Sequence, residues 1–312
     1  MTQNQSTTYR RILVPLDGSS AAETVLPWVE CMAGWGNSEL ILLHVLEPHA
    51  PVLRHGQPHL TRQSEAQRYL EDHQKRLCAE SFRTRIRIVQ DGSGMDLPGH
   101  MVQVARDTGS GLIALCTHGR TDPGRWLFGS IAQRLMTAAD LDIFVLSPEG
   151  IRRPVQPAFR RLLVPLDGEA SHEQALVRAA DLATQTGAEL ALIHIAETRQ
   201  NLDGFEAVRA RLSPRTFDAL LDESRQEIAL YLEERSAVWR GRGLRVTTAL
   251  LEGNPRDRLA ELASNGSYDL VVLSSHGHLV SESVPTPGFA PAFSLKSPIP
   301  VLIVPAAISG VH

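Results

Sequence analysis

"RRILVPLDG" at residues 10–18 returns as "RRLLVPLDG" at residues 160–168, with eight of nine positions identical at a spacing of 150 residues. Three further pairs keep nearly this register: "ELILLHVLE" (39–47) with "ELALIHIAE" (189–197), "GLIALCTHG" (111–119) with "DLVVLSSHG" (269–277), and "IFVLSP" (143–148) with "PVLIVP" (300–305). A period of this length is too long for a solenoid repeat and indicates a duplicated domain. We therefore expect a first domain at 1–150, a linker at 151–159 and a second domain at 160–312.

Within each copy, apolar runs alternate with amphipathic stretches. In the first copy we expect strands at 11–16, 39–45, 84–90, 112–116 and 142–146, and helices at about 20–34, 62–80, 98–107 and 130–139. Near-continuous apolar runs such as "LILLHV" are typical of parallel strands covered on both faces, whereas the alternation in "RTRIRIVQ" favours an edge strand. The capping-box spacing Ser20–Glu23 places a helix start just after "PLDG". The pattern predicts an α/β fold of two tandem, doubly wound, Rossmann-like domains.

Composition excludes several classes of protein. The chain of 312 residues is 43% hydrophobic and 21% charged, with a net charge of −4 and a pI of about 6.3. It therefore lacks the basic footprint of a nucleic-acid-binding protein. No apolar run approaches the ~20 residues that span a bilayer, and "MTQNQSTTYRR" lacks the apolar core of a signal peptide. Three scattered cysteines without a C-x-x-C pattern predict a cytoplasmic protein with no disulfide framework and no zinc cluster.

The expected ligand site lies where the strand order reverses, because ligands of open α/β sheets bind there, outside the carboxyl ends of the strands. Asp17 follows the first strand, and Cys116 ends the fourth, just before the loop "THGRTDPGRWLFGS" (117–130). That loop carries three glycines, two arginines and a serine: Gly119, Gly124, Gly129, Arg120, Arg125 and Ser130. Glycines let a backbone approach a phosphate closely, and a following helix start offers free N–H groups. The loop has the chemistry of a phosphate site, and a plain surface turn is the alternative.

Two common nucleotide folds are disfavoured. The sequence contains no G-x-x-x-x-G-K-[ST], and no G-x-G-x-x-G follows the first strand. The first absence argues against a P-loop NTPase and the second against the usual dinucleotide-binding fold.

Taken together, "ILVPLDGSSAAE", "LLHV", "THGR" and "GSIAQRLM…IFVLSP" resemble the universal stress protein family, and the resemblance covers the chain twice. ATP-binding members carry G-x2-G-x9-G-[ST]. Here Gly119, Gly129 and Ser130 match this signature, and Cys116 replaces its first glycine. The resemblance implies a five-stranded parallel sheet of order 3-2-1-4-5 in each domain. It also implies an intramolecular pseudo-dimer that packs through the last strands, 143–146 and 301–304.

The same resemblance implies the ligand contacts. ATP or AMP, with or without Mg²⁺, would bind the first domain. Asp17 would contact the adenosine part, and the backbone of Val45 would face the adenine. The amides of Gly119 and Gly129–Ser130 would hold phosphates, with Arg120 adding positive charge. For Asp17, a role as a turn or helix-capping aspartate is the alternative reading, and for Ser130 a plain N-cap is compatible with phosphate binding.

The second copy departs from the signature. It keeps Asp167, Ile195 and "SSHG" (274–277), but Pro287 stands ten residues past Gly277 in place of a Gly-Ser pair. We expect this phosphate loop to be degenerate, so that the second domain binds nucleotide weakly or not at all.

Several other side chains have both a functional and a structural interpretation. His49, His55 and His59 lie in one loop and could bind zinc, and so could His276 and His278, in and next to "SSHG" (274–277), but neither spacing fits a standard zinc site. Cys116 could be a redox sensor, but a packed strand-end cysteine is favoured. His44 and His194 recur at one strand position, which favours core histidines bonded to neighbouring backbone.

The sequence is compatible with three functions. The first is a nucleotide-binding stress-response regulatory protein with one competent site; the second is a slow ATPase or phosphotransferase; the third is a nucleotide-free scaffold. Near the loop only Asp17, Asp122 and His118 could assist a chemical step, and no Walker-type lysine is present. This scarcity favours binding over catalysis. A protein partner, not identified by the sequence, and a further homodimer also stay open.

Overall fold

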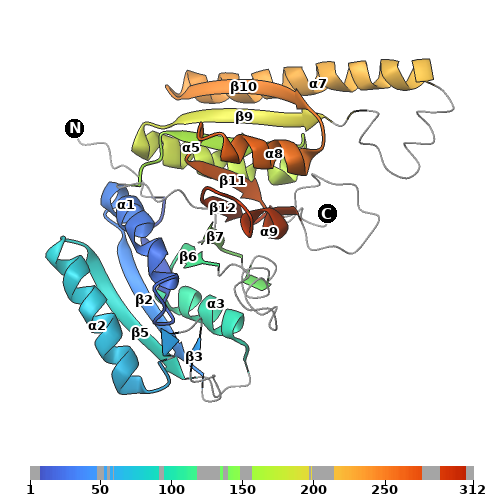
Figure 1. Ribbon diagram of the computed structural model, residues 1–312. Coiled ribbons are helices and arrows are strands. Elements are labelled where there is room, and N and C mark those ends of the chain that lie inside the picture. The colour runs from blue at the N-terminus through green and yellow to red at the C-terminus, as the bar shows by residue number, and fades with distance from the viewer. Residues whose placement is uncertain are drawn as a thin grey trace, which may run out of the picture. The chain divides into compact units, whose positions relative to one another are not determined.

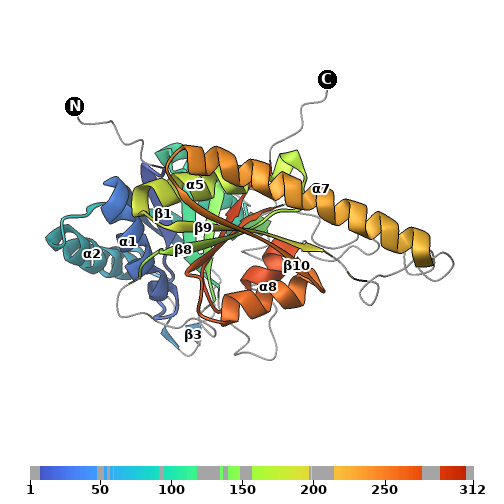
Figure 2. The ribbon, with the colours of Figure 1, turned by 90° about the horizontal axis from the view of Figure 1, so that it is seen from above.

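The computed structural model describes residues 8–47, 53–54, 57–58, 60–90, 95–117, 134–135, 140–147, 157–196, 198, 214–275 and 289–306. The chain divides into two compact units (Figures 1 and 2). The first contains Met1–Ala158 and Ser294–Pro305, and the second contains Phe159–Phe293 and Ala306–His312.

The first unit is built on a sheet whose five parallel strands are all provided by the first repeat. They are β1 (Arg11–Pro15), β2 (Glu39–Leu46), β5 (Arg83–Gln90), β6 (Leu112–Cys116) and β7 (Asp142–Leu146). Their spatial order is β5-β2-β1-β6-β7. This confirms the predicted order 3-2-1-4-5. In the centre, Ile12 of β1 lies opposite Leu40 on one side and Leu112 on the other.

Burial along the strands follows their sequence patterns. Every described position of β6 and β7 is buried, and so are seven of the eight positions of β2. Continuous burial requires cover on both faces, as expected for apolar parallel strands. By contrast, β5 alternates exposed and half-buried positions along most of its length. It lies at the edge of the sheet, as its alternating sequence predicts.

The helices described in full in the first unit are η1 (Ala22–Val25), α1 (Leu26–Gly36), α2 (Gln63–Ala79) and α3 (Leu97–Thr108). The predicted capping box at Ser20–Glu23 is wrong. The hydroxyl of Ser19 accepts the hydrogen bond from the N–H of Ala22, at 3.1 Å, and the first turn is a 3-10 turn. The α-helix begins only at Leu26, next to Pro27, because proline is favoured in a first helical turn. Of the predicted helix at 130–139, the structure describes only residues 134–135.

A sixth strand completes the sheet of the first unit. It is β12 (Val301–Val304), which comes from the second repeat and pairs antiparallel with β7. Leu302 lies opposite Phe144, and both are buried. The predicted association of segments 143–146 and 301–304 is therefore seen as direct strand pairing, and the expected five strands of this sheet become six. The added strand covers an edge of β7 that would otherwise expose unpaired backbone groups.

Four parallel strands are formed by the described residues of the second unit. These are β8 (Arg161–Pro165), β9 (Glu189–Ala196), β10 (Arg245–Glu252) and β11 (Leu270–Ser274), in the order β10-β9-β8-β11. Order 3-2-1-4 repeats that of the first unit. In the strand order of the sheet, the fifth strand of this repeat, β12, follows β11, as the predicted order 3-2-1-4-5 requires, although β12 groups with the first unit.

Helices of the second unit include η2 (Ala170–His172), α5 (Gln174–Thr186), α7 (Pro214–Gly241) and α8 (Pro255–Ser264), while α9 (Phe289–Ser294) ends where the chain enters the first unit again. The long helix α7 packs on β10 and β9 and continues past the end of β10 (Figures 1 and 2). Among the described residues, no helix combines the length and the apolar character needed to cross a membrane.

The assignment of β12 to the first unit can be tested by a matched pair of substitutions. In a Trp239→Phe background all remaining tryptophans lie in the first unit, so their fluorescence reports its unfolding. Leu302→Ala should destabilise that transition by about 2–5 kcal/mol, because it removes a buried side chain opposite Phe144. Leu192→Ala, in the core strand β9 of the second unit, is the control and should shift it far less. Equal shifts in urea denaturation would contradict the assignment.

Candidate functional site

The strand order of the first unit reverses between β1 and β6. From β1 the chain proceeds outward to β2 and β5, and then returns to β6 on the other side of β1. Asp17 follows β1, Cys116 ends β6, and Val45 lies one residue from the end of β2. The structure thus brings these three predicted site residues to one edge of the sheet, where ligands of such folds bind. Gly119, Arg120, Gly129 and Ser130 lie outside the described residues.

Asp17 is held in a tight turn. Its Oδ1 accepts hydrogen bonds from the backbone N–H of Ser19 at 3.0 Å and from the Ser19 hydroxyl at 2.6 Å. Gly18 has a φ of +90°, and a Cβ there would come within 2.9 Å of the Leu60 side chain, so the turn requires glycine. Asp17 therefore stabilises a turn, which is the role predicted from the sequence as the alternative to contacting adenosine. The turn also fixes the position of the carboxylate at the end of β1.

Cys116 is packed against the helix entry. Cys116 is only 7% exposed, and its Sγ lies 3.2 Å from the hydroxyl of Thr24 in η1. The next residue, Thr117, donates from its N–H and its hydroxyl to the carbonyl of Leu146, at 2.7 and 3.0 Å. These contacts support the interpretation of Cys116 as a packed strand-end cysteine, and they fasten β6 to β7 just before the loop.

A histidine near the carboxyl end of β2, and another at the matching position of β9, bond to the backbone beside the strand ends. His44 is 1% exposed, with Nδ1 2.7 Å from the Leu16 carbonyl and Nε2 3.0 Å from that of Leu60. In the second unit, Nδ1 of His194 lies 2.8 Å from the carbonyl of Leu166. Burial lowers the pKa of His194, which favours its neutral form. Both histidines bond to neighbouring backbone as predicted, and His44 lies in the core, whereas His194 is only half-buried.

Sequence reasoning missed a polar cluster beside Asp17. Oε1 of Glu23 accepts from the Tyr69 hydroxyl at 3.0 Å and lies 3.3 Å from Nε2 of His73, so that it links η1 to α2. Burial raises the pKa of Tyr69, and the negative charges of Glu23 and Asp17 raise it further, so the phenol stays a neutral donor.

The second unit repeats this cluster with one exchange. The Tyr231 hydroxyl donates to Glu173 at 3.1 Å, and Arg235 approaches the same oxygen at 2.7 Å, in the role that His73 has in the first unit. The signal that could have revealed both clusters is the recurrence of a Glu five residues after "PLDG" and of a Tyr in the second long helix of each repeat.

The edge that corresponds to the candidate site is built differently in the second unit. Asp167 accepts from the N–H of Glu169 at 3.0 Å, and its other oxygen lies 2.6 Å from Nδ1 of His172. Ser274, which corresponds to Cys116, has a buried hydroxyl with no hydrogen-bond partner among the described residues. Gly277 and Pro287 lie outside those residues, and so does the predicted loss of the phosphate cradle between them.

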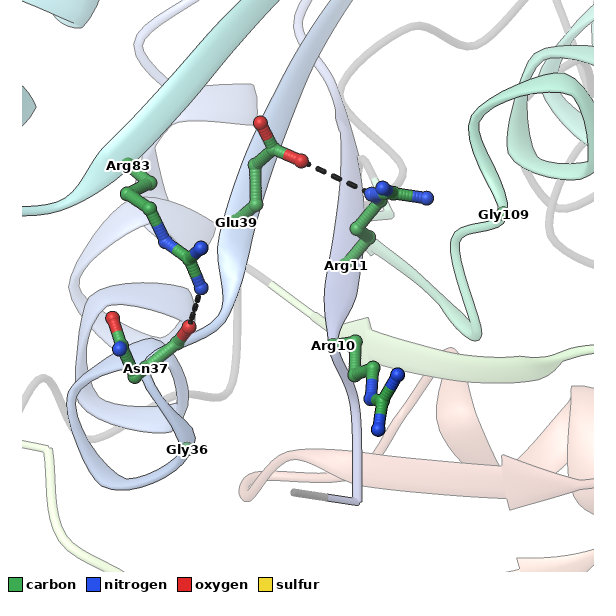
Figure 3. Close-up of a pocket in the computed structure, with 7 residues that line it drawn as sticks. All are labelled: Arg10, Arg11, Gly36, Asn37, Glu39, Arg83 and Gly109. Carbon is green, nitrogen blue, oxygen red and sulfur yellow. Dashed lines mark hydrogen bonds and ion pairs between the residues drawn. The ribbon is translucent and has the colours of Figure 1, made fainter. Parts of the chain in front are cut away.

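A separate cavity of about 560 Å³ opens at the amino ends of the strands in the first unit, opposite Asp17 (Figure 3). Its lining is rich in arginine: Arg10, Arg11, Gly36, Asn37, Glu39, Arg83 and Gly109.

Two of these arginines hold helix ends. Arg11 donates to Glu39 at 3.0 Å and to the carbonyl of Thr108, at the end of α3, at 2.7 Å. Arg83 donates to the carbonyl of Asn37, which ends α1 in the left-handed conformation. Such contacts satisfy carbonyls that a helix leaves unpaired, and the positive charge of the guanidinium interacts favourably with the negative end of the helix dipole. In the second unit Arg245 donates likewise to the carbonyl of Gly187 at 2.7 Å. The recurrence assigns these arginines a structural role.

The five histidines that could bind zinc by their place in the sequence all lie outside the described residues. Within the described part of the chain, no group of three or more His, Cys, Asp or Glu side chains could hold a metal ion.

Comparisons with known proteins identify the family. The model of the universal stress protein family matches residues 8–147 and again residues 158–305. Universal stress protein Rv2005c of Mycobacterium tuberculosis is 25% identical over 273 residues, which cover 85% of this chain and 87% of the relative. Universal stress protein MJ0531 of Methanocaldococcus jannaschii is 25% identical over 146 residues, 47% of this chain and 82% of its own.

A solved structure shares the fold. The universal stress protein from Archaeoglobus fulgidus aligns over 97% of this chain and 98% of its own, with a TM-score of 0.64 at 14% identity. The chain belongs to the universal stress protein family and contains two tandem copies of its domain. The resemblance that the sequence motifs indicated is thereby confirmed.

The Tyr69–Glu23 contact predicts a change in alkaline stability. Because folding raises the pKa of Tyr69 above its ordinary value of 10.0, its contribution to stability is complete below pH 10 and is lost as the pH rises further. Tyr69→Phe should cost about 0.5–1.5 kcal/mol at pH 7, and its unfolding free energy should fall less steeply above pH 10 than that of the wild type. Urea denaturation followed by fluorescence in the Trp239→Phe background measures both. Parallel pH profiles for Tyr69→Phe and the wild type would contradict the assignment.

Proposed function

We propose that the first repeat binds an adenine nucleotide and that the protein acts as a stress-response regulator whose conformation or partner choice depends on that nucleotide. The observation that carries this proposal is that Asp17, Cys116 and Val45 lie at the carboxyl ends of the neighbouring strands β1, β6 and β2, where the strand order reverses between β1 and β6. A carboxylate fixed by its own turn suits an acceptor for the hydroxyl groups of a sugar. The position at the carboxyl ends of parallel strands suits a nucleotide.

The remaining contacts of this proposal come from the loop after β6. Gly119, Gly129 and Ser130 match the family's phosphate signature and would bind phosphates through backbone N–H groups. Arg120 would add charge-assisted contacts to the same anion. The ligand is ATP or AMP, and Mg²⁺ would accompany the triphosphate. We place the protein in the cytoplasm, with domains at 1–150 and 160–312 and a linker at 151–159.

The residues near the loop after β6 favour regulation over catalysis. A phosphoryl transfer needs a positioned base and groups that neutralise charge at the transferred phosphate. The sequence offers Asp17, Asp122 and His118 near the loop but no Walker-type lysine. Asp17 is moreover engaged by Ser19 in a turn. A slow ATPase or phosphotransferase is the second candidate, and the tests below separate the two.

Stoichiometry provides the first test. Calorimetric titration with ATP at physiological magnesium should show one site per chain, because only the first repeat keeps the Gly119, Gly129 and Ser130 pattern. Two equal sites would contradict the degenerate second repeat. If ATP, ADP and AMP all fail to bind, the nucleotide-free scaffold replaces the regulator.

Point substitutions locate the site. Asp17→Ala should weaken ATP binding by roughly tenfold to a hundredfold, since a charge-assisted hydrogen bond contributes about 1.5–3 kcal/mol. Gly129→Val should weaken it more, because a β-branched side chain would stand where the phosphate approaches the backbone. Asp167→Ala, the matched control in the second repeat, should leave ATP affinity unchanged.

Turnover separates the regulator from the enzyme. The purified protein with Mg-ATP should hydrolyse far less than the ~1 per second typical of dedicated enzymes. Release of phosphate at that rate, abolished by Asp17→Ala while ATP still binds, would establish the enzyme in place of the regulator.

A further inference from the structure

The second repeat contains a buried pair of side chains that the first repeat lacks. Nδ1 of His172 lies 2.6 Å from Oδ2 of Asp167, and the two side chains are only 8% and 11% exposed. The other carboxylate oxygen, Oδ1, accepts the N–H of Glu169 at 3.0 Å. Both oxygens of this aspartate are therefore engaged by the protein itself.

The first repeat shows what this pair adds to a shared turn. At the spacing of 150 residues, Asp17 corresponds to Asp167, and Ser19 corresponds to Glu169. The N–H of Ser19 reaches Oδ1 of Asp17 at 3.0 Å, the same contact at the same distance as in the second repeat. His172, however, corresponds to Ala22, whose methyl group cannot donate a hydrogen bond. The turn is thus common to both repeats, and the imidazole belongs to the second alone.

We propose that His172 closes the second repeat to adenine nucleosides by binding Asp167 in place of the ligand. The inference rests on the proposed function, because Asp167 matters as the counterpart of the aspartate that would contact adenosine. A ligand that reaches Asp167 must break a short, buried, charge-assisted hydrogen bond and displace the imidazole from its packed position. Closure by His172 would act at the adenosine end of the site and is independent of the segment between Gly277 and Pro287 that corresponds to the phosphate loop of the first repeat.

Adenosine tests this closure without involving the phosphate loop. In an Asp17→Ala background, which weakens the first site, replacement His172→Ala should increase the affinity for adenosine at least tenfold. His172→Gln is the matched control and should not, because its amide can still donate to Asp167. Adding Asp167→Ala to the His172→Ala chain should remove the gain. Equal affinities of the His172→Ala and His172→Gln chains, measured by calorimetry, would overturn the proposal.

The reciprocal substitution covers the case in which His172→Ala fails to fold. Ala22→His places the same imidazole beside Asp17 in the first repeat, and Ala22→Leu adds similar bulk without a donor. Affinity for ATP should be at least tenfold lower for Ala22→His than for Ala22→Leu, at equal thermal stability. Equal affinities would again overturn the closure.

The outcomes separate this inference from the proposed function. If the wild-type chain binds no nucleotide, the proposed function fails. The effect of His172→Ala on adenosine affinity can still be measured, because it concerns the second repeat and is determined in the Asp17→Ala background, in which the first site is weakened. If the wild type binds ATP at one site and His172→Ala adds no adenosine affinity, only the closure by His172 fails.

Discussion

The double pairing of β1 organises the first unit. This strand hydrogen-bonds to β2 on one side and to β6 on the other, and its three central residues are buried. A strand covered on both faces and paired on both edges cannot shift its register without exposing its apolar side chains. Because β1 is fixed, the turn after it is fixed as well, and Asp17 is held beside the end of β6. The candidate site is a consequence of where this strand ends.

Much of this could be predicted from the sequence, because the signals are local or repeated. Continuous apolar runs marked the buried strands, the alternating "RTRIRIVQ" marked the edge strand β5, and the repeat marked the two copies. The helix start was misplaced because two serines precede η1 and the sequence does not show which hydroxyl faces Ala22. Ser19 does, since its hydroxyl is already oriented by Asp17. The grouping of β12 with the first unit depends on pairing between distant segments, which local patterns do not encode.

The two repeats differ in side chains around a common backbone turn. The Tyr–Glu link between the 3-10 turn and the long helix occurs in both, and only its third member changes, from His73 to Arg235. Around the aspartate after the first strand, in contrast, Ala22 is replaced by a histidine that binds the carboxylate. The aspartate turn and the Tyr–Glu link are thus kept in both repeats, whereas one neighbour of each differs.

The membership of β12 in the first unit has a consequence for biosynthesis. The ribosome completes the five parallel strands of the first repeat long before it reaches residues 301–304. During that interval the outer edge of β7 has no strand beside it, and an unpaired apolar edge is a template for aggregation. Nearly the whole second repeat must emerge before this edge is covered. The nascent chain therefore has a long period of vulnerability, and a chain that lacks residues 301–304 would carry an incomplete first sheet.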